Sequence, residues 1–174
     1  MNILGEKVIL RAISMEDSQL LLDLINDDDT ESMLGGYSFP VSAEQQKRWI
    51  AELSTRTDIL RCIVACKDDV NVGVGTVILS DIDYKNGTAQ IHIKLASNIG
   101  RGKGFGTDAV NTMVKYAFKE LRLHCVYADV LEYNIPSQKL FAKCGFEKDG
   151  VLRARVYKNG KYVNVFSFSR LDQL

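Results

Sequence analysis

The sequence predicts a single α/β domain, residues 1–174, in which helices flank a mixed and mostly antiparallel sheet. Two observations lead to this prediction. The 174 residues are 46% hydrophobic and 25% charged, which fits one compact domain with an ample core. Alternating and helical segments follow in the order β-α-α-β-β-β-α-β-α-β-β, so a meander of three strands leads into two strands joined by a helix. A helical crossover permits parallel pairing at that one place in the sheet.

Local signals set the ends of the expected elements. Ser14 and Ser42 are typical helix N-caps, and Ser42 with Gln45 forms a capping-box pattern. Pro136 suits the first turn of a helix, where a missing N–H costs nothing. Asn-Gly at residues 159–160 is a strong hairpin signal. The sequence predicts helices at residues 14–27, 42–55, 107–120 and 135–143, and strands at residues 7–12, 59–66, 72–80, 88–95, 125–131, 150–157 and 162–170.

A glycine-rich run lies between the third strand of the meander and the following helix. Residues 100–106 read G-R-G-K-G-F-G, with four glycines and two cations. Glycine lets a bulky anion approach the main chain without meeting a Cβ atom. The first turn of the next helix offers unpaired N–H donors and partial positive charge. The run therefore predicts a phosphate-binding site, and the alternative is a flexible turn with two solvated cations.

The spacing of these glycines excludes two better-known phosphate loops. A G-x-G-x-x-G dinucleotide motif would need glycine at Phe105 or Thr107. An NTP-binding P-loop would need Ser or Thr after the lysine, where Gly104 stands instead. A nucleotide-binding domain of either kind is therefore disfavoured.

The balance of charge restricts the partners of the chain. Twenty-two basic and twenty-two acidic side chains cancel, so no overall field attracts nucleic acid or an anionic membrane surface. No apolar run approaches the ~18 residues of a membrane span, and the N-terminal residues do not resemble a signal peptide. We therefore expect neither a nucleic-acid nor a membrane partner, and we expect a cytoplasmic location.

The four cysteines do not suggest a metal site. Cys62 and Cys66 fall on one expected strand, where a four-residue step spans about 13 Å, too far for two thiolates to share one zinc ion. Both histidines, His92 and His124, lack a neighbouring ligand at suitable spacing. We expect no metal, and we expect the cysteines to act as small hydrophobic residues of the core.

Two motifs in the second half of the chain resemble the GCN5-related N-acetyltransferase (GNAT) superfamily. Residues 101–106 read R-G-K-G-F-G and match the Q/R-x-x-G-x-G/A acyl-CoA loop of that superfamily. Residues 134–146 read N-I-P-S-Q-K-L-F-A-K-C-G-F and resemble its N-x-x-S/A-x-x-L-(Y/F)-x-x-x-G-F segment. The opening K-V-I-L-R-A and the ending G-V-L-R-x-x-x-Y-K-N-G-K-Y resemble the branch that acetylates ribosomal proteins and spermidine. The likeness covers nearly the whole chain.

The resemblance implies a GNAT-like acyl-CoA N-acyltransferase fold and acetyl transfer from acetyl-CoA to a primary amine, by direct attack within a ternary complex. It also implies that the strand before the glycine loop splays from the strand after the loop's helix, with the pantetheine arm in the gap. A backbone N–H at about Ile93 or Lys94 is then expected to polarise the thioester carbonyl. The residues expected to bind acetyl-CoA are His92, Ile93, Lys94, Arg101, Gly102, Lys103, Gly104, Phe105, Gly106, Thr107 and Asn134.

The acid that protonates the leaving thiolate is less well defined by the resemblance. Many relatives carry tyrosine where this chain has Phe141, which has no proton to donate. Ser137 is the nearest substitute, at a position where some ribosomal-protein acetyltransferases carry a serine with that role. Its alternative role is a helix-start serine that bonds the backbone. Tyr133 is a third candidate, and a CoA thiolate is already a tolerable leaving group near neutral pH.

The base that takes the proton of the amine is also open. Relatives often have glutamate where Gln90 stands, and an amide does not accept a proton usefully. His92 lies on the same strand face, and its unperturbed pKa of about 6.5 suits the task. The alternatives are a His92 that is merely packed or exposed, with Glu132 or water as the base.

The acceptor is expected to be a small amine or polyamine, or a protein N-terminal α-amine. Residues 35–39 and the hairpin at 157–162 are expected to recognise it, with Tyr37, Phe39 and Trp49 as candidate walls. A polyamine would need a cluster of carboxylates, which residues 27–31 supply, and the alternative is an acidic helix end that only faces solvent. The resemblance also allows a homodimer. A second function, a non-catalytic acyl-CoA-binding module, would explain Phe141 and Gln90 as signs of lost chemistry.

Overall fold

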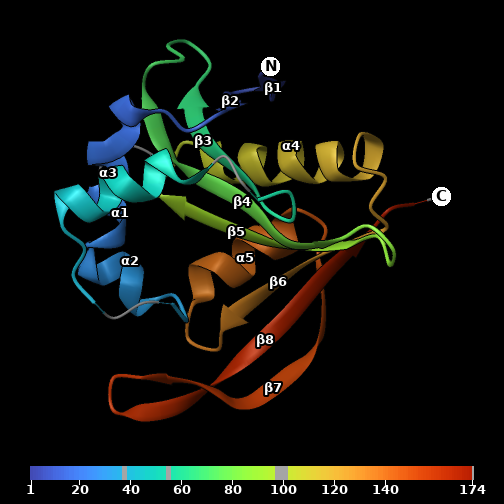
Figure 1. The fold of residues 1–174 in the computed structure, drawn as a ribbon. Coiled ribbons are helices and arrows are strands. Elements are labelled where there is room, and N and C mark those ends of the chain that lie inside the picture. The colour runs from blue at the N-terminus through green and yellow to red at the C-terminus, as the bar shows by residue number, and fades with distance from the viewer. Residues whose placement is uncertain (37–38, 54–55, 97–101, 174) are drawn as a thin grey trace.

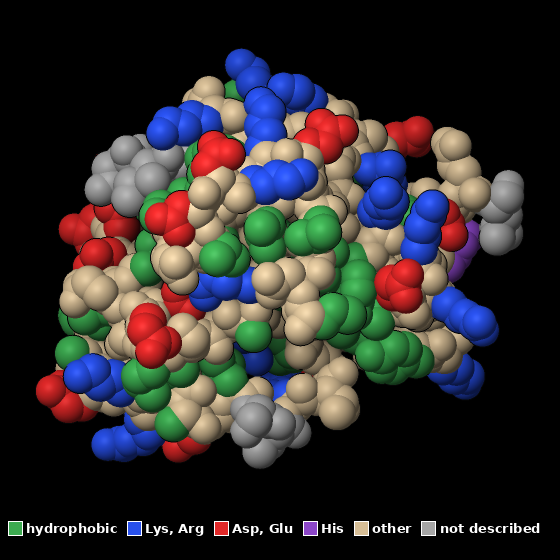
Figure 2. All heavy atoms as spheres, turned by 90° about the horizontal axis from the view of Figure 1, so that it is seen from above, with side chains coloured by type: hydrophobic (Ala, Val, Ile, Leu, Met, Phe, Trp, Pro, Cys, Tyr) green, Lys and Arg blue, Asp and Glu red, His purple; other side chains and the backbone are tan. Residues whose placement is uncertain are grey.

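The computed structural model describes residues 1–36, 39–53, 56–96 and 102–173. Figure 1 shows a twisted central sheet with helices on both sides and a long hairpin, β7–β8, at one edge of the sheet. Figure 2 shows basic and acidic side chains intermixed over one face of the molecule, with hydrophobic side chains between them. No helix within the described residues is long and apolar enough to cross a membrane. The strands are β1 (Ile3–Leu4), β2 (Val8–Arg11), β3 (Leu60–Cys66), β4 (Gly73–Asp83), β5 (Thr88–Leu95), β6 (Cys125–Leu131), β7 (Glu147–Lys158) and β8 (Lys161–Leu171). The helices are a short 3₁₀ helix (Met15–Asp17), α1 (Ser18–Ile25), α2 (Asp28–Ser32), α3 (Ala43–Ala51), α4 (Phe105–Lys119) and α5 (Ile135–Lys143).

The described strands form one eight-stranded sheet in the order β1-β2-β3-β4-β5-β6-β8-β7. Its neighbours pair antiparallel, except that β5 and β6 pair parallel across the α4 crossover. The expected mixed and mostly antiparallel sheet is therefore confirmed, including the place of the parallel pair. The expected meander corresponds to β3, β4 and β5.

Alternation along the strands divides the core between the two faces of the sheet. On β3, Cys62 and Val64 belong to the main core with α4 and α5, whereas Ile63 and Ala65 pack with α1 and α3. Because successive side chains of a strand point to opposite faces, α4 and α5 cover one face, and α1 and α3 cover the other. Cys62 is a buried core residue, as expected from its position in a strand.

Three differences from the sequence-based expectation affect the site, besides shifts at the ends of other elements, such as α3, which ends at Ala51. A short strand, β1, precedes the first expected strand and pairs with β2. The first expected helix ends close to its predicted limit, at Ile25, and a helix that was not predicted, α2, begins where the Asp27 side chain accepts the N–H of Thr30. The aspartates at 27–29 therefore begin a new helix rather than only ending the old one. Helix α4 starts at Phe105, two residues early, because Gly104 takes a left-handed conformation at its N-cap.

Helix α4 is fixed to the N-terminal strands by one carboxylate. Asp108, in the first turn of α4, accepts the backbone N–H groups of Glu6, Lys7 and Val8 at 3.2, 2.7 and 2.9 Å. Hydrogen bonds to a charged group contribute more to stability than neutral ones. This contact holds the start of α4, and with it the glycine loop, against β2.

We expect Asp108→Ala to lower the free energy of unfolding by about 2–3 kcal/mol, because three backbone donors lose a charged acceptor and two of them are partly solvated. Urea unfolding followed by circular dichroism measures the change. Asp68→Ala, in the exposed β3–β4 turn, is the matched control and should stay within about 0.5 kcal/mol of the parent. Equal stability of the two variants would show that Asp108 does not anchor the helix.

Candidate active site

A cleft opens where β5 and β6 stop pairing. Their parallel pairing runs from Thr88 with Cys125 to Gln90 with Tyr127, yet β5 continues to Leu95 and β6 to Leu131. Two cavities, of about 490 and 670 Å³, lie along this divergence. They share the lining residues Met33, Leu34, Ile93, Lys94, Asn134 and Ser137. The two cavities therefore meet between the splayed strands.

The larger cavity ends at the glycine loop and the N-terminus of α4. Gly102, Gly104, Gly106 and Thr107 line it. Gly102 and Gly104 have φ of +81° and +79°, a conformation that side chains rarely adopt. The first-turn N–H groups of α4, a helix of 15 residues, have no acceptor within the helix and carry partial positive charge. This end of the cleft can bind an anionic group such as phosphate.

The remaining loop residues and two further lysines surround the same end. Lys103 and Phe105 adjoin the lining glycines, while Arg101 lies outside the described residues. The Lys7 ammonium donates to the carbonyl of Lys103 at 3.3 Å, and Lys143 of α5 lines the cavity. Lys7 and Lys143 were not predicted, because their distance from the loop in the sequence gives no signal of contact. Both add positive charge near the expected phosphate site.

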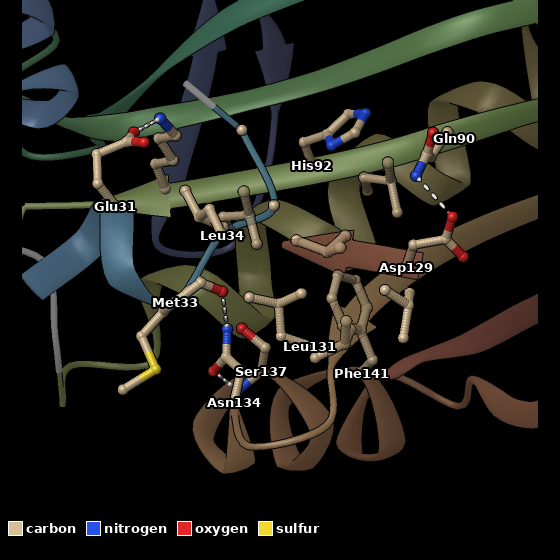
Figure 3. Close-up of a pocket in the computed structure, with 18 of the residues that line it drawn as sticks. Glu31, Met33, Leu34, Gln90, His92, Asp129, Leu131, Asn134, Ser137 and Phe141 are labelled. Atoms are coloured by element: carbon tan, nitrogen blue, oxygen red, sulfur yellow. Dashed lines mark hydrogen bonds and ion pairs between the residues drawn. The ribbon is translucent and has the colours of Figure 1, made fainter. Parts of the chain in front are cut away.

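The far wall of the cleft is formed by the turn between β6 and α5 (Figure 3). Asn134 caps α5 by accepting the N–H of Ser137 at 3.2 Å, and its amide donates to the carbonyl of Met33 at 3.0 Å. The Tyr133 hydroxyl donates to the carbonyl of Ser32 at 2.6 Å. These bonds hold the chain after α2 across the cleft. The Asn134 amide group has a second N–H donor besides the one bonded to Met33, whereas Tyr133 would have to leave Ser32 before it could give its proton to another group.

The smaller cavity is lined by polar side chains from the face of β5 and β6 opposite to α4. Figure 3 shows Gln90 and His92 on β5 above Leu34 and Phe141, with Asp129 of β6 close to Gln90. The Gln90 amide donates to the Asp129 carboxylate at 3.4 Å. The predicted placement of Gln90 and His92 on one strand face is thus confirmed, and both line the cavity together with Lys94.

A buried ion pair closes the edge of this cavity. Lys94 of β5 donates to Glu31 of α2 at 2.9 Å, and both side chains are mostly buried. The second carboxylate oxygen of Glu31 is buried and has no hydrogen-bond partner among the described residues. A buried carboxylate oxygen without a donor is costly, so this oxygen is a good acceptor for a cationic ligand.

The environment of His92 favours its neutral form. The pKa of His92 is lowered from its ordinary value, mainly because the surrounding protein displaces water from the ring. Lys94 lowers this pKa further, while Asp81 and Asp129 offset part of the shift. The side chain nevertheless keeps exposed surface at the rim of the cavity. At neutral pH His92 is therefore an unprotonated imidazole that a ligand can reach.

The residues expected to recognise an acceptor are only partly brought together. Gly35 and Gly36 line the smaller cavity, while Tyr37 lies outside the described residues. Trp49 does not line it, because its ring packs against the Arg61 guanidinium at 5.4 Å. From β7, Arg155 and Val156 line the cavity rather than the tyrosines at the hairpin tip, which pair with each other.

The sequence reasoning missed one carboxylate in this cavity, Asp129, and gave the other, Glu31, only as part of an acidic cluster. Asp129 lies two residues after Tyr127, which pairs with Gln90, so the parallel pairing places Asp129 on the same face beyond Gln90. That register could have revealed Asp129. Glu31 appeared only as one of four acidic residues, and its place in the cleft depends on the interruption between α1 and α2.

The comparisons with known proteins agree with this geometry. A family model for an acetyltransferase (GNAT) domain matches residues 7–147. The uncharacterized prophage-derived N-acetyltransferase YokL of Bacillus subtilis is 32% identical over 164 residues, which are 94% of this chain and 89% of that protein. Spermidine N(1)-acetyltransferase of Vibrio cholerae is 34% identical over 92 residues, 53% of each chain. A crystal structure of spermidine N-acetyltransferase from Vibrio cholerae with CoA and spermine has a TM-score of 0.86 at 25% identity, over 95% of each chain.

The splayed strand pair, the glycine N-cap of α4 and these similarities define an N-acetyltransferase. The chain belongs to the GNAT family of acetyltransferases. Membership in this family favours an enzyme over the second function considered above, a non-catalytic acyl-CoA-binding module. The resemblance seen in the two sequence motifs is confirmed.

Proposed function

We propose that this protein transfers an acetyl group from acetyl-CoA to a small cationic amine, by direct attack within a ternary complex. The observation that carries this proposal is the pair of connected cavities between β5 and β6. One has main-chain donors and lysines suited to phosphates, and the other has carboxylates and a neutral histidine suited to an amine. An acyl group held where the cavities meet is within reach of both.

The residues fit acetyl-CoA at the glycine end. The main-chain N–H groups of residues 102–107 would hold the diphosphate, assisted by Lys7 and Lys143, and the backbone of His92, Ile93 and Lys94 would hold the pantetheine arm. Acetyl-CoA supplies an activated acyl group and a thiolate leaving group. A strand N–H at Ile93 or Lys94 would polarise the acetyl carbonyl, because strands that diverge leave backbone donors unpaired.

The smaller cavity favours a small amine over the end of a protein chain. Its volume of about 490 Å³ is typical of small-molecule sites. Asp129 and the unpaired oxygen of Glu31 provide negative charge at two points of the lining, and two cations oppose them, Lys94, which is paired with Glu31, and Arg155. Two separated carboxylates suit a ligand with more than one ammonium group. Acetylation of spermidine by the similar Vibrio cholerae enzyme is consistent with this class of acceptor.

An acceptor panel tests the proposal. We expect CoA release from acetyl-CoA with spermidine, spermine and short diamines, and much slower release with peptides that carry a free N-terminus. Asp129→Asn should raise the KM for the amine about 10-fold, since a charged hydrogen bond contributes about 1.5 kcal/mol. The KM for acetyl-CoA should not change. Fast turnover of peptides with inert polyamines would instead assign the protein N-terminal α-amine as the acceptor.

A further inference from the structure

The side chains of His92, Ser80 and Asp81 form a hydrogen-bonded series that begins at the smaller cavity. The Nε2 atom of His92 lies 2.8 Å from the hydroxyl oxygen of Ser80, on the neighbouring strand β4. The Ser80 hydroxyl in turn lies 3.2 Å from a carboxylate oxygen of Asp81. The series His92–Ser80–Asp81 connects a ring nitrogen in the cleft to a carboxylate at the surface.

The number of protons in this series fixes the direction of each hydrogen bond. Ionised Asp81 only accepts, so the single hydroxyl proton of Ser80 is donated to it. The Ser80 oxygen then accepts from His92, which must carry its proton on Nε2. Neutral His92 is therefore expected as the Nε2–H tautomer, with a free lone pair on Nδ1. No described residue forms a hydrogen bond with Nδ1, and His92 lines the smaller cavity (Figure 3).

The backbone conformation at Asp81 helps to bring the side chains of Ser80 and Asp81 together. The pairing of β4 and β5 shifts register between Ser80 and Asp83, and Asp81 within this bulge has φ of +50°. A left-handed conformation at a residue other than glycine is uncommon and concentrates at functional sites. A bulge also redirects side chains. Here it allows consecutive residues, Ser80 and Asp81, to point to each other instead of to opposite faces of the sheet.

We propose that His92 is the catalytic base, acting through Nδ1, and that Ser80 and Asp81 are positioning residues that hold it in the Nε2–H tautomer. The proposal rests on the proposed function, because it names the base for the same amine. The ammonium of the acceptor gives one proton to Nδ1 of His92. The freed lone pair forms the N–C bond as the C–S bond breaks, and the electron pair of that bond stays on sulfur. The Ser137 hydroxyl gives its proton to the thiolate and takes the second proton lost by the nitrogen, and His92 returns its proton to solvent.

The charges around the ring set the direction of each expected change. Asp81 on β4 and Asp129 on β6 raise the pKa of His92, while Lys94 on β5 lowers it. Arg155 of β7 also lines the cavity. Asp81→Asn should therefore lower the pKa of His92 further. Because Asn tolerates a left-handed backbone and its oxygen still accepts from Ser80, the tautomer should be kept in this variant.

Nitrogen NMR of the two imidazole rings tests the tautomer without any acceptor. The chain has only two histidines, so a His124→Gln variant, which changes an exposed residue outside the cleft, assigns the His92 signals. We expect the Nε2–H form of His92 in the parent and a mixture of tautomers in Ser80→Ala. An Nδ1–H form in the parent would overturn the proposal, as would an unchanged tautomer in Ser80→Ala.

The pH dependence of turnover on spermidine tests the catalytic role. In the parent, kcat should rise with pH as His92 loses its proton, with a midpoint below about 6.5. His92→Gln should lower kcat about 100-fold and abolish this limb, and Ser80→Ala should lower kcat about 10-fold with unchanged KM for acetyl-CoA. The same pH limb in His92→Gln would overturn the proposal and point to Asp129 or water. If the NMR spectra show the expected tautomer but no amine is acetylated, the proposed function is contradicted. The conclusion that Ser80 and Asp81 set the tautomer of His92 would still hold.

Discussion

Gly104→Glu abolishes CoA binding, with a loss of affinity of at least about 100-fold by isothermal titration calorimetry. Gly104 forms the N-cap of α4 and has φ of +79°, so any side chain is strained there. A carboxylate about 4 Å from a phosphate charge costs on the order of 4 kcal/mol near a protein surface. The new side chain would also meet the Lys7 ammonium, since a Cβ at this position lies 3.0 Å from it. The variant therefore adds a carboxylate that repels the phosphate, and this carboxylate also neutralises the Lys7 ammonium.

Gly160→Glu is the matched control for this experiment. Gly160 has φ of +80° in the β7–β8 turn, and nothing lies within 4 Å of a Cβ atom built there. The control carries the same backbone strain and the same charge, far from the glycine loop. Its affinity for CoA should equal that of the parent. Equal losses in both variants would show a general effect of strain, and no loss in either would remove the phosphate site from the N-terminus of α4.

Ser137→Ala lowers kcat at least 10-fold if the serine hydroxyl protonates the leaving thiolate. Ser137 lines both cavities at the point where they meet. The helix cap uses its backbone N–H and the side chain of Asn134, and the Ser137 hydroxyl has no hydrogen bond to any described residue. Removal of the hydroxyl therefore leaves the cap intact, and the melting temperature should not change. Steady-state assays with spermidine measure the loss.

Phe141→Tyr is a rescue variant that tests whether Ser137 acts as the acid or only as a residue at the start of the helix. The Phe141 side chain is buried and lines the smaller cavity on the same helix, one turn further along. In the Ser137→Ala background, a tyrosine at 141 should restore much of the lost kcat by supplying a hydroxyl. Full activity of Ser137→Ala alone would contradict the acid role. A loss of activity that Phe141→Tyr does not restore would also count against it.

Local sequence signals were sufficient to predict the fold and the end of the site at the glycine loop. The alternation in β3, β4 and β5, the glycines before α4 and the Asn134 segment each act over a few residues, so their structure follows from nearby chemistry. The grouping of His92 and Lys94 with Asn134 and Ser137 around one cleft follows from the parallel pairing of β5 and β6. That pairing was expected from the element order.

Contacts between distant segments could not be predicted in the same way. Glu31 reaches Lys94 only because Asp27 starts a second short helix, and a run of aspartates indicates a helix end as readily as a helix start. Lys7 meets the glycine loop because Asp108 holds the N-terminal chain against α4. The contact between Ser80 and His92 depends on strand register, and the bond from Ser80 to Asp81 depends on a bulge, so composition and spacing do not reveal either one.

A crystal structure with bound CoA tests the central claim most directly. It should place the diphosphate within hydrogen-bond distance of the main-chain N–H groups of residues 102–107. The pantetheine arm should lie between β5 and β6, with its sulfur close to the Ser137 hydroxyl and the Nδ1 side of His92 facing the same space. A diphosphate bound at any other surface, with the N-terminus of α4 free of it, would contradict the assignment of this cleft as the active site.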